Sequence, residues 1–83
     1  MRILDQDNDN KLDQICIYLR LEEAKELRDF LDDLISNPPA GQHRHVSSED
    51  FQKEITVCLY DKNNKEIMQQ FDKRSIKLIE KDI

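Results

Sequence analysis

The sequence predicts an α+β fold, a two-layer sandwich in the order ββαββα, with a four-stranded, mainly antiparallel sheet and two helices on one face. Two stretches predict strands, because β-branched and aromatic residues alternate with other residues along them. Two others predict helices, because their apolar residues recur every three or four positions. A chain of 83 residues has room for one core, so we expect a single domain spanning residues 1–83.

A hairpin is expected to open the fold. Met1–Leu4 is a short apolar start, and the Asp- and Asn-rich residues after it favour a turn, because their side chains bond nearby backbone groups. Leu12–Leu19 is expected as a strand. One face of that strand would hold Ile15, Ile17 and Leu19.

A helix is expected over Leu21–Ile35, with glutamates in its first turn, where carboxylates suit the positive end of the helix dipole. It should stop before Pro38 and Pro39, since proline disfavours helical geometry in the residue that precedes it. Its apolar face, which needs a sheet or another helix to cover it, consists of Leu21, Ala24, Leu27, Leu31 and Leu34.

The second half repeats the pattern. Ser36–Gln42 contains both prolines and the only glycine and is expected to be an irregular loop. His43–Ser47 predicts a short strand and Phe51–Tyr60 a second one. Asn64–Lys81 predicts a final helix, with Ser75 interrupting its apolar stripe.

The charge is unevenly distributed along the chain. Residues 1–50 hold 12 acids and 6 bases, a net charge of −6, whereas residues 51–83 hold 6 acids and 7 bases, a net charge of +1. A pI near 4.9 argues against nucleic acid or an anionic membrane as partner, because both need a basic surface. The chain has no apolar run long enough for a membrane span and no basic, then apolar, leader, so we expect a cytoplasmic protein.

Two cysteines without metal-binding spacing predict reduced, buried thiols. Cys16 and Cys58 each have apolar neighbours, and in a reducing compartment such thiols behave as small apolar side chains.

Two segments resemble metal sites, and neither supplies a full set of ligands. The residues from Asp5 to Asp13 place carboxylates as a calcium loop does, but the twelfth position is Cys16 instead of the bidentate glutamate. His43 and His45 would share one face of a strand, but zinc needs three or four ligands. We therefore expect no metal and no cofactor, although a metal- or ligand-sensing domain built on these segments is a second hypothesis for function.

Catalytic motifs are missing from the sequence. The serines lie in no nucleophile elbow, and the single glycine cannot form a phosphate-binding loop. We therefore expect no enzymatic activity and assign no catalytic residue.

Four acidic residues of the first helix form the candidate site, because they follow the helical spacing on the face opposite its apolar stripe. They are Glu22, Glu26, Asp29 and Asp33. Such a stripe either keeps a small protein soluble or steers a basic partner. The leading hypothesis is a non-enzymatic protein that binds a basic protein, as small acidic inhibitors of the immunity type do. A third hypothesis is a structural subunit that forms a homodimer through a sheet edge.

Overall fold

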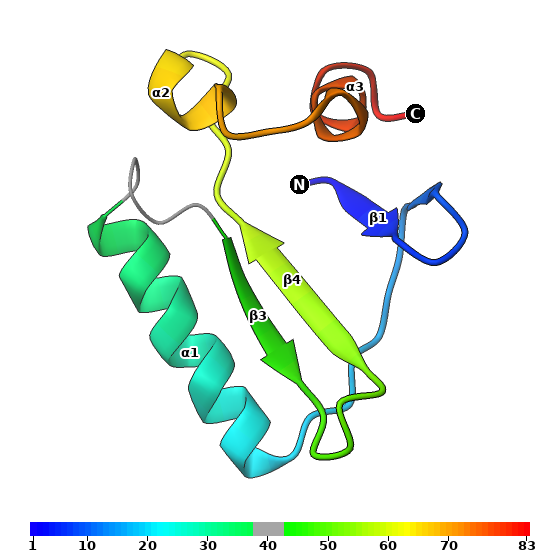
Figure 1. Cartoon of the computed structure of the whole chain (residues 1–83), viewed down its shortest axis with the longest axis vertical. Coiled ribbons are helices and arrows are strands. Elements are labelled where there is room, and N and C mark those ends of the chain that lie inside the picture. The colour runs from blue at the N-terminus through cyan, green and yellow to red at the C-terminus, as the bar shows by residue number, and fades with distance from the viewer. Residues whose placement is uncertain (38–42) are drawn as a thin grey trace.

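The computed structural model describes residues 1–37 and 43–83, which form two separate two-stranded antiparallel sheets and three helices (Figure 1). The elements are β1 (Ile3–Asp5), β2 (Asn10–Leu12), α1 (Leu21–Ser36), β3 (His43–Ser47), β4 (Glu54–Cys58), α2 (Lys65–Met68) and α3 (Lys73–Lys81). The class is α+β, but the predicted single four-stranded sheet with two helices on one face is wrong, because β1–β2 and β3–β4 do not join. Residues 38–42 of the predicted loop lie outside the described residues.

The opening hairpin is confirmed, and its turn is organised by one carboxylate. Strands β1 and β2 pair from Ile3↔Leu12 to Asp5↔Asn10. Asp5 Oδ1 accepts the backbone N–H groups of Asp7 at 3.0 Å and Asn8 at 3.3 Å, and Oδ2 accepts the Asn8 amide at 3.1 Å. The Asn8 side chain, followed by these backbone bonds, lowers the pKa of Asp5.

The strand predicted over Leu12–Leu19 is wrong for most of its length. Pairing ends at Leu12, and residues 14–20 form no strand. The side chains that the prediction placed in a sheet are exposed to solvent: Ile15 is 53 %, Ile17 45 % and Tyr18 91 % exposed. Apolar residues that recur at every second position predict an extended segment. They do not predict which other strand that segment pairs with.

The first helix is confirmed within one residue, because α1 ends at Ser36. Glu23 helps to start it by accepting the backbone N–H of Arg20 at 2.9 Å. The expected apolar face is only partly right. The side that is withdrawn from solvent contains Glu23, Leu27, Phe30 and Leu34, whereas Leu21, Ala24, Leu31 and Ile35 are exposed. Helix α1 contacts β3 and lies along it, on the side away from β4 (Figure 1).

The second hairpin confirms both of its predicted strands, although β4 is shorter than Phe51–Tyr60. Its register includes Val46↔Ile55. The turn is closed by the Ser48 N–H, which donates to the Lys53 carbonyl at 2.9 Å. Phe51 within the turn has φ of 58°, a left-handed conformation that is unusual for a bulky residue.

The single final helix predicted over Asn64–Lys81 is wrong, because the chain forms α2 and α3 with a break between them. Each helix has its own N-cap. The Asn64 side chain accepts the Ile67 N–H at 3.3 Å, and the Asp72 side chain accepts the Ser75 N–H at 2.8 Å. An aspartate whose side chain caps a new helix start favours a separate helix over continuation of the previous one.

Substituting Asp72 tests this cap. Asp72→Ala is expected to lower the free energy of unfolding by about 1 kcal/mol at neutral pH, whereas Asp72→Asn should be close to wild type because asparagine also caps. Hydrogen bonds from Ser75, backbone first, lower the pKa of Asp72 from its ordinary 3.8. The wild-type stabilisation is therefore complete above pH 3.8 and lost as pH falls through the lower, folded pKa. Chemical denaturation at several pH values measures it, and an alanine variant as stable as wild type would exclude the cap.

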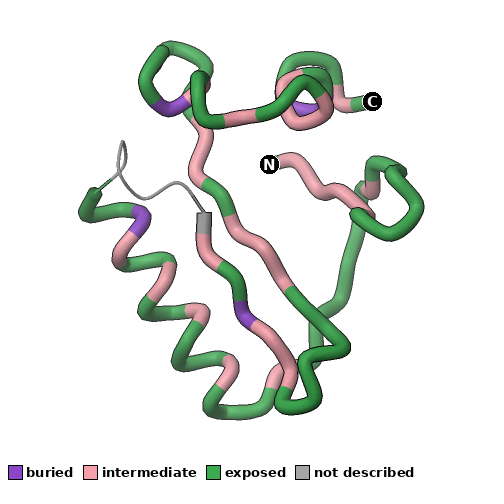
Figure 2. The backbone as a smooth tube through the Cα atoms, in the orientation of Figure 1, coloured by how far each residue is buried: buried purple, intermediate pink, exposed green. Residues whose placement is uncertain are grey.

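The core is small. Its buried apolar residues come from α1, β3, α2 and α3, and Figure 2 shows how few they are along the backbone. They are Leu34, Val46, Ile67, Leu78 and Ile79.

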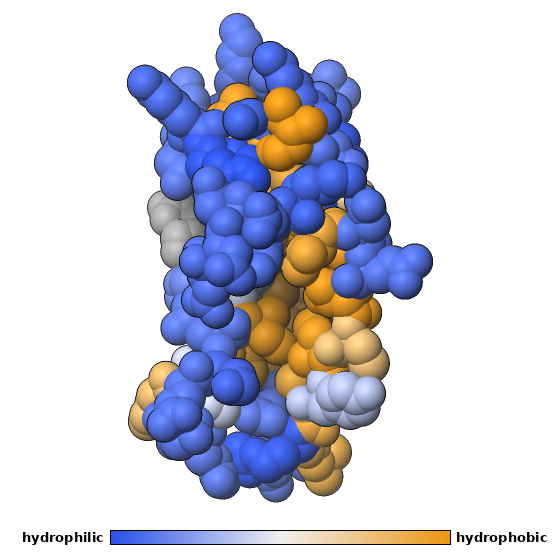
Figure 3. All heavy atoms as spheres, turned by 90° about the vertical axis from the view of Figure 1, so that its right-hand side faces the viewer, coloured by the Kyte–Doolittle hydropathy of each residue, from blue (hydrophilic) through white to orange (hydrophobic). Residues whose placement is uncertain are grey.

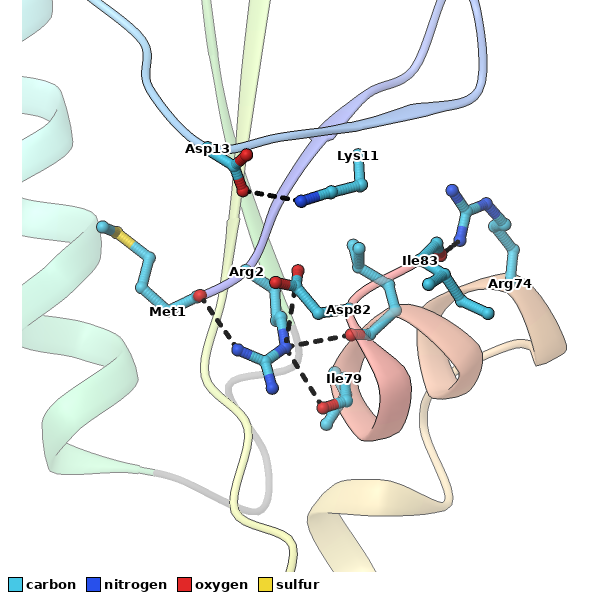
Figure 4. A network of polar contacts seen from close by, with 9 residues as sticks. Met1, Arg2, Lys11, Asp13, Arg74, Ile79, Asp82 and Ile83 are labelled. Carbon is cyan, nitrogen blue, oxygen red and sulfur yellow. Dashed lines mark hydrogen bonds and ion pairs between the residues drawn. The ribbon is translucent and has the colours of Figure 1, made fainter.

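Polar contacts attach the first hairpin to α3 (Figure 4). Arg2 Nε donates to the carbonyl oxygens of Leu78 at 3.0 Å and Ile79 at 3.2 Å in the last turn of α3. The Leu78 carbonyl also accepts the Asp82 N–H at 2.9 Å. Near the other end of α3, Arg74 Nε lies 2.6 Å from Asp9 Oδ1. Polar side-chain contacts therefore join the hairpin to α3 at both ends of the helix.

Candidate protein-binding surface

One flank of α1 is strongly acidic. The helix carries six carboxylates and two basic side chains. We call the four predicted residues, Glu22, Glu26, Asp29 and Asp33, the acidic flank. At 100° per residue they lie within a sector of about 60° around the helix axis. The helix thus presents a coherent negative surface beside the face that packs on β3.

Three members of the acidic flank are open to solvent. The side chain of Glu22 is 74 % exposed and its Oε2 lies 3.5 Å from Arg20 Nη1. Asp29 is 63 % exposed and accepts from Arg28 Nε at 3.1 Å. Glu26 is exposed and makes no ion pair with any of the described residues. Exposed pairs of this kind contribute little, so these carboxylates can exchange their present contacts for those of a partner.

Asp33 has a different role from the other three. Arg44 of β3 donates to Asp33 Oδ2 through Nε at 3.1 Å and through Nη2 as well. Both side chains are partly withdrawn from solvent, so this contact joins α1 to β3. Sequence spacing groups Asp33 with the flank because it reports only the helix, whereas the partner lies on another element.

The β3–β4 turn lies next to the start of α1. Arg20 Nη1 contacts Glu49 of this turn at 2.9 Å, and Arg20 Nε lies 3.7 Å from Glu23. Phe51, in the same turn, is 84 % exposed. The sequence predicted Phe51 as part of a strand, and its position as an exposed aromatic in a turn was missed. The left-handed backbone of Phe51, which takes it out of the strand, has no signature in the sequence.

The two segments that resemble metal sites use their polar atoms internally. Both carboxylate oxygens of Asp5 accept hydrogen bonds from the turn. His45 Nδ1 lies 2.8 Å from Thr56 Oγ1 and 2.9 Å from Glu54 Oε1, while the side chain of His43 lies outside the described residues. Among the side chains that the structure describes, no group of three or more His, Cys, Asp or Glu residues could hold a metal ion.

The predicted burial of the cysteines is wrong. Cys16 and Cys58 are both free and both exposed. Cys16 is exposed because its segment joins no sheet, and Cys58 ends β4. Partial desolvation nevertheless raises the pKa of the Cys58 thiol, which makes it less reactive than an ordinary exposed cysteine.

No helix in residues 1–37 and 43–83 combines the length and the apolar character that a bilayer crossing needs. No protein-family model, curated protein or solved structure matches the chain.

Proposed function

We propose that this chain is a non-enzymatic interaction protein that binds a basic protein through the acidic flank of α1, as an inhibitor of the immunity type. The observation that supports it most directly is the exposure of Glu22, Glu26 and Asp29 on one side of a helix whose other side is anchored to β3. A helix fixed in this way holds its carboxylates in a set arrangement before the partner arrives.

Electrostatics explains how such a surface would act. Carboxylates of one sign attract a basic partner over a distance and speed its association, and salt screens this attraction. The ion pair from Asp33 to Arg44 keeps the helix in place, so Asp33 supports the surface more than it contacts the partner. The cytoplasm is the compartment in which we place this function, because free, exposed cysteines suit a reducing environment.

Charge reversal on the flank tests the proposal. Glu26→Lys with Asp29→Lys should leave the thermal melt within a few degrees of wild type, because exposed charges contribute little to folding. The same variant should lose most of its capture of basic proteins from a native lysate at low salt. The readout is mass spectrometry of proteins retained by the immobilised chain, at low and at moderate salt.

The matched control reverses two exposed glutamates on other helices, Glu66→Lys with Glu80→Lys. Both variants change the net charge by the same amount. They differ only in which part of the surface carries the reversed charges. Proteins retained by wild type and by the control, and lost with the flank variant, support the proposal. Equal retention by all three chains would show that the flank only keeps the protein soluble.

A further inference from the structure

Strand β4 has a free edge. It pairs only with β3, and no hydrogen bond joins it to another strand in residues 1–37 and 43–83. In an antiparallel pair, alternate residues direct their N–H and C=O groups toward the partner strand and away from it. The bond from Ser48 N–H to the Lys53 carbonyl sets this alternation. The backbone groups of Glu54, Thr56 and Cys58 therefore face outward.

A second segment has the side chains of a strand and no partner strand. Residues 14–19 alternate as a half-buried strand would, yet they belong to neither sheet. Ile15 and Ile17 are about half exposed, although β-branched side chains of this pattern normally cover a core. Residues 1–37 and 43–83 therefore contain both a strand edge without a partner and a segment with a strand-like pattern that belongs to no sheet.

A hollow lies between the unpaired segment and the start of β4, where Glu54 and Ile55 line it. It has a volume of about 990 Å³ and lies between the first hairpin with residues 16–20 and the β3–β4 hairpin. Figure 3 shows apolar side chains gathered in a hollow along this face. Among the apolar residues that line it are Leu4, Leu12, Ile17, Leu19, Val46 and Ile55.

The chain exposes more surface than a compact monomer of its size. Its accessible surface is 6557 Å², against about 5,200 Å² for a compact monomer of 9.9 kDa. Its radius of gyration is 13.4 Å, against about 12 Å for a compact domain of 83 residues. A stable protein–protein interface buries about 800 Å² on each partner. This area is smaller than the difference between the accessible surface of the chain and that of a compact monomer.

We propose that a second copy of this chain fills the hollow, with residues 14–19 of each copy adding to the free edge of β4 in the other. A two-fold axis makes the same contact occur twice: the segment of the first copy pairs with β4 of the second, and the segment of the second copy pairs with β4 of the first. One interface therefore supplies a partner for both β4 edges and both segments. The apolar residues of the hollow would then form the centre of the interface. This self-association is independent of the acidic flank and goes beyond the binding function proposed above.

Charge gives this dimer a distinctive salt dependence. The chain has a net charge of −5, and acidic residues border the hollow, including Asp7, Glu49 and Glu54. Two copies therefore repel each other, and added salt should strengthen their association by screening that repulsion. Capture of a basic protein should weaken with salt, so the two proposals respond to salt in opposite directions.

Sedimentation of the purified chain over a range of concentrations, at low and moderate salt, tests the proposal. We expect the mass to rise from 9.9 kDa toward twice that value, and at lower concentration when salt is higher. Ile17→Lys places a charge inside the interface and should weaken the dimer at least tenfold, a cost of about 1.4 kcal/mol. Ile35→Lys is the matched control, because Ile35 is 69 % exposed on α1 and lies outside the hollow; it should dimerise as wild type does.

Hydrogen exchange of the wild-type chain supplies a readout that needs no variant. On dimerisation, protection should appear at the outward amides of Thr56 and Cys58 and within residues 14–19, with α1 unchanged. A chain that stays monomeric at all concentrations and salts would overturn the proposal. A dimer that Ile35→Lys weakens, or that protects α1 instead of β4, would overturn it as well.

Discussion

Leu34→Ala is expected to lower the free energy of unfolding by about 2–4 kcal/mol, because it removes a buried leucine and leaves a cavity. Leu34 is 2 % exposed, the lowest value among the core residues, and it lies on the side of α1 that packs against β3. A small domain with so few buried side chains has little stability to lose, so the variant should be partly unfolded at room temperature.

The matched control is Leu31→Ala on the same helix. Leu31 is 43 % exposed, so its truncation loses fewer contacts and should cost less than about 1 kcal/mol. Urea denaturation followed by circular dichroism measures both free energies. Equal losses for the two variants would mean that α1 packs through its predicted apolar face instead of the observed one.

Local patterns predicted α1 and both hairpins, because each depends on residues close together in the chain. The helix followed from its spacing and its first-turn glutamates, and the opening turn from its run of Asp and Asn. The break between α2 and α3 was also present in the sequence, since Asp72 is a favourable N-cap and Ser75 interrupts the stripe. The apolar residues on both sides of the break follow helical spacing, and this spacing led to the prediction of one continuous helix.

Long-range pairing was not predictable in the same way. The pattern in residues 14–19 is that of a strand, yet nothing in it names a partner, and the structure leaves the segment unpaired. The acidic flank shows the same limit: spacing placed its four carboxylates on one side of α1, but only the fold shows that Asp33 contacts Arg44.

Arg2→Met is expected to cost roughly 2 kcal/mol, since hydrogen bonds made by a charged group contribute about 1.5–3 kcal/mol. Arg2 donates to two carbonyls at the end of α3, and its Nε lies 3.8 Å from Asp82 Oδ1 (Figure 4). Its side chain is only 26 % exposed, so water replaces these contacts poorly. Methionine keeps much of the apolar stem and removes the guanidinium, so the measured loss reports the polar contacts.

The control is Lys11→Met on the same hairpin, which removes one positive charge from an exposed pair with Asp13. It should leave the free energy of unfolding close to that of wild type, because exposed ion pairs contribute little. Hydrogen exchange should show β1 and the last turn of α3 losing protection together in Arg2→Met, while α1 and β3 keep theirs, because the lost contacts join only the hairpin to α3. If Arg2→Met and Lys11→Met unfold at the same denaturant concentration, the Arg2 contacts contribute nothing and apolar packing alone holds the hairpin against α3.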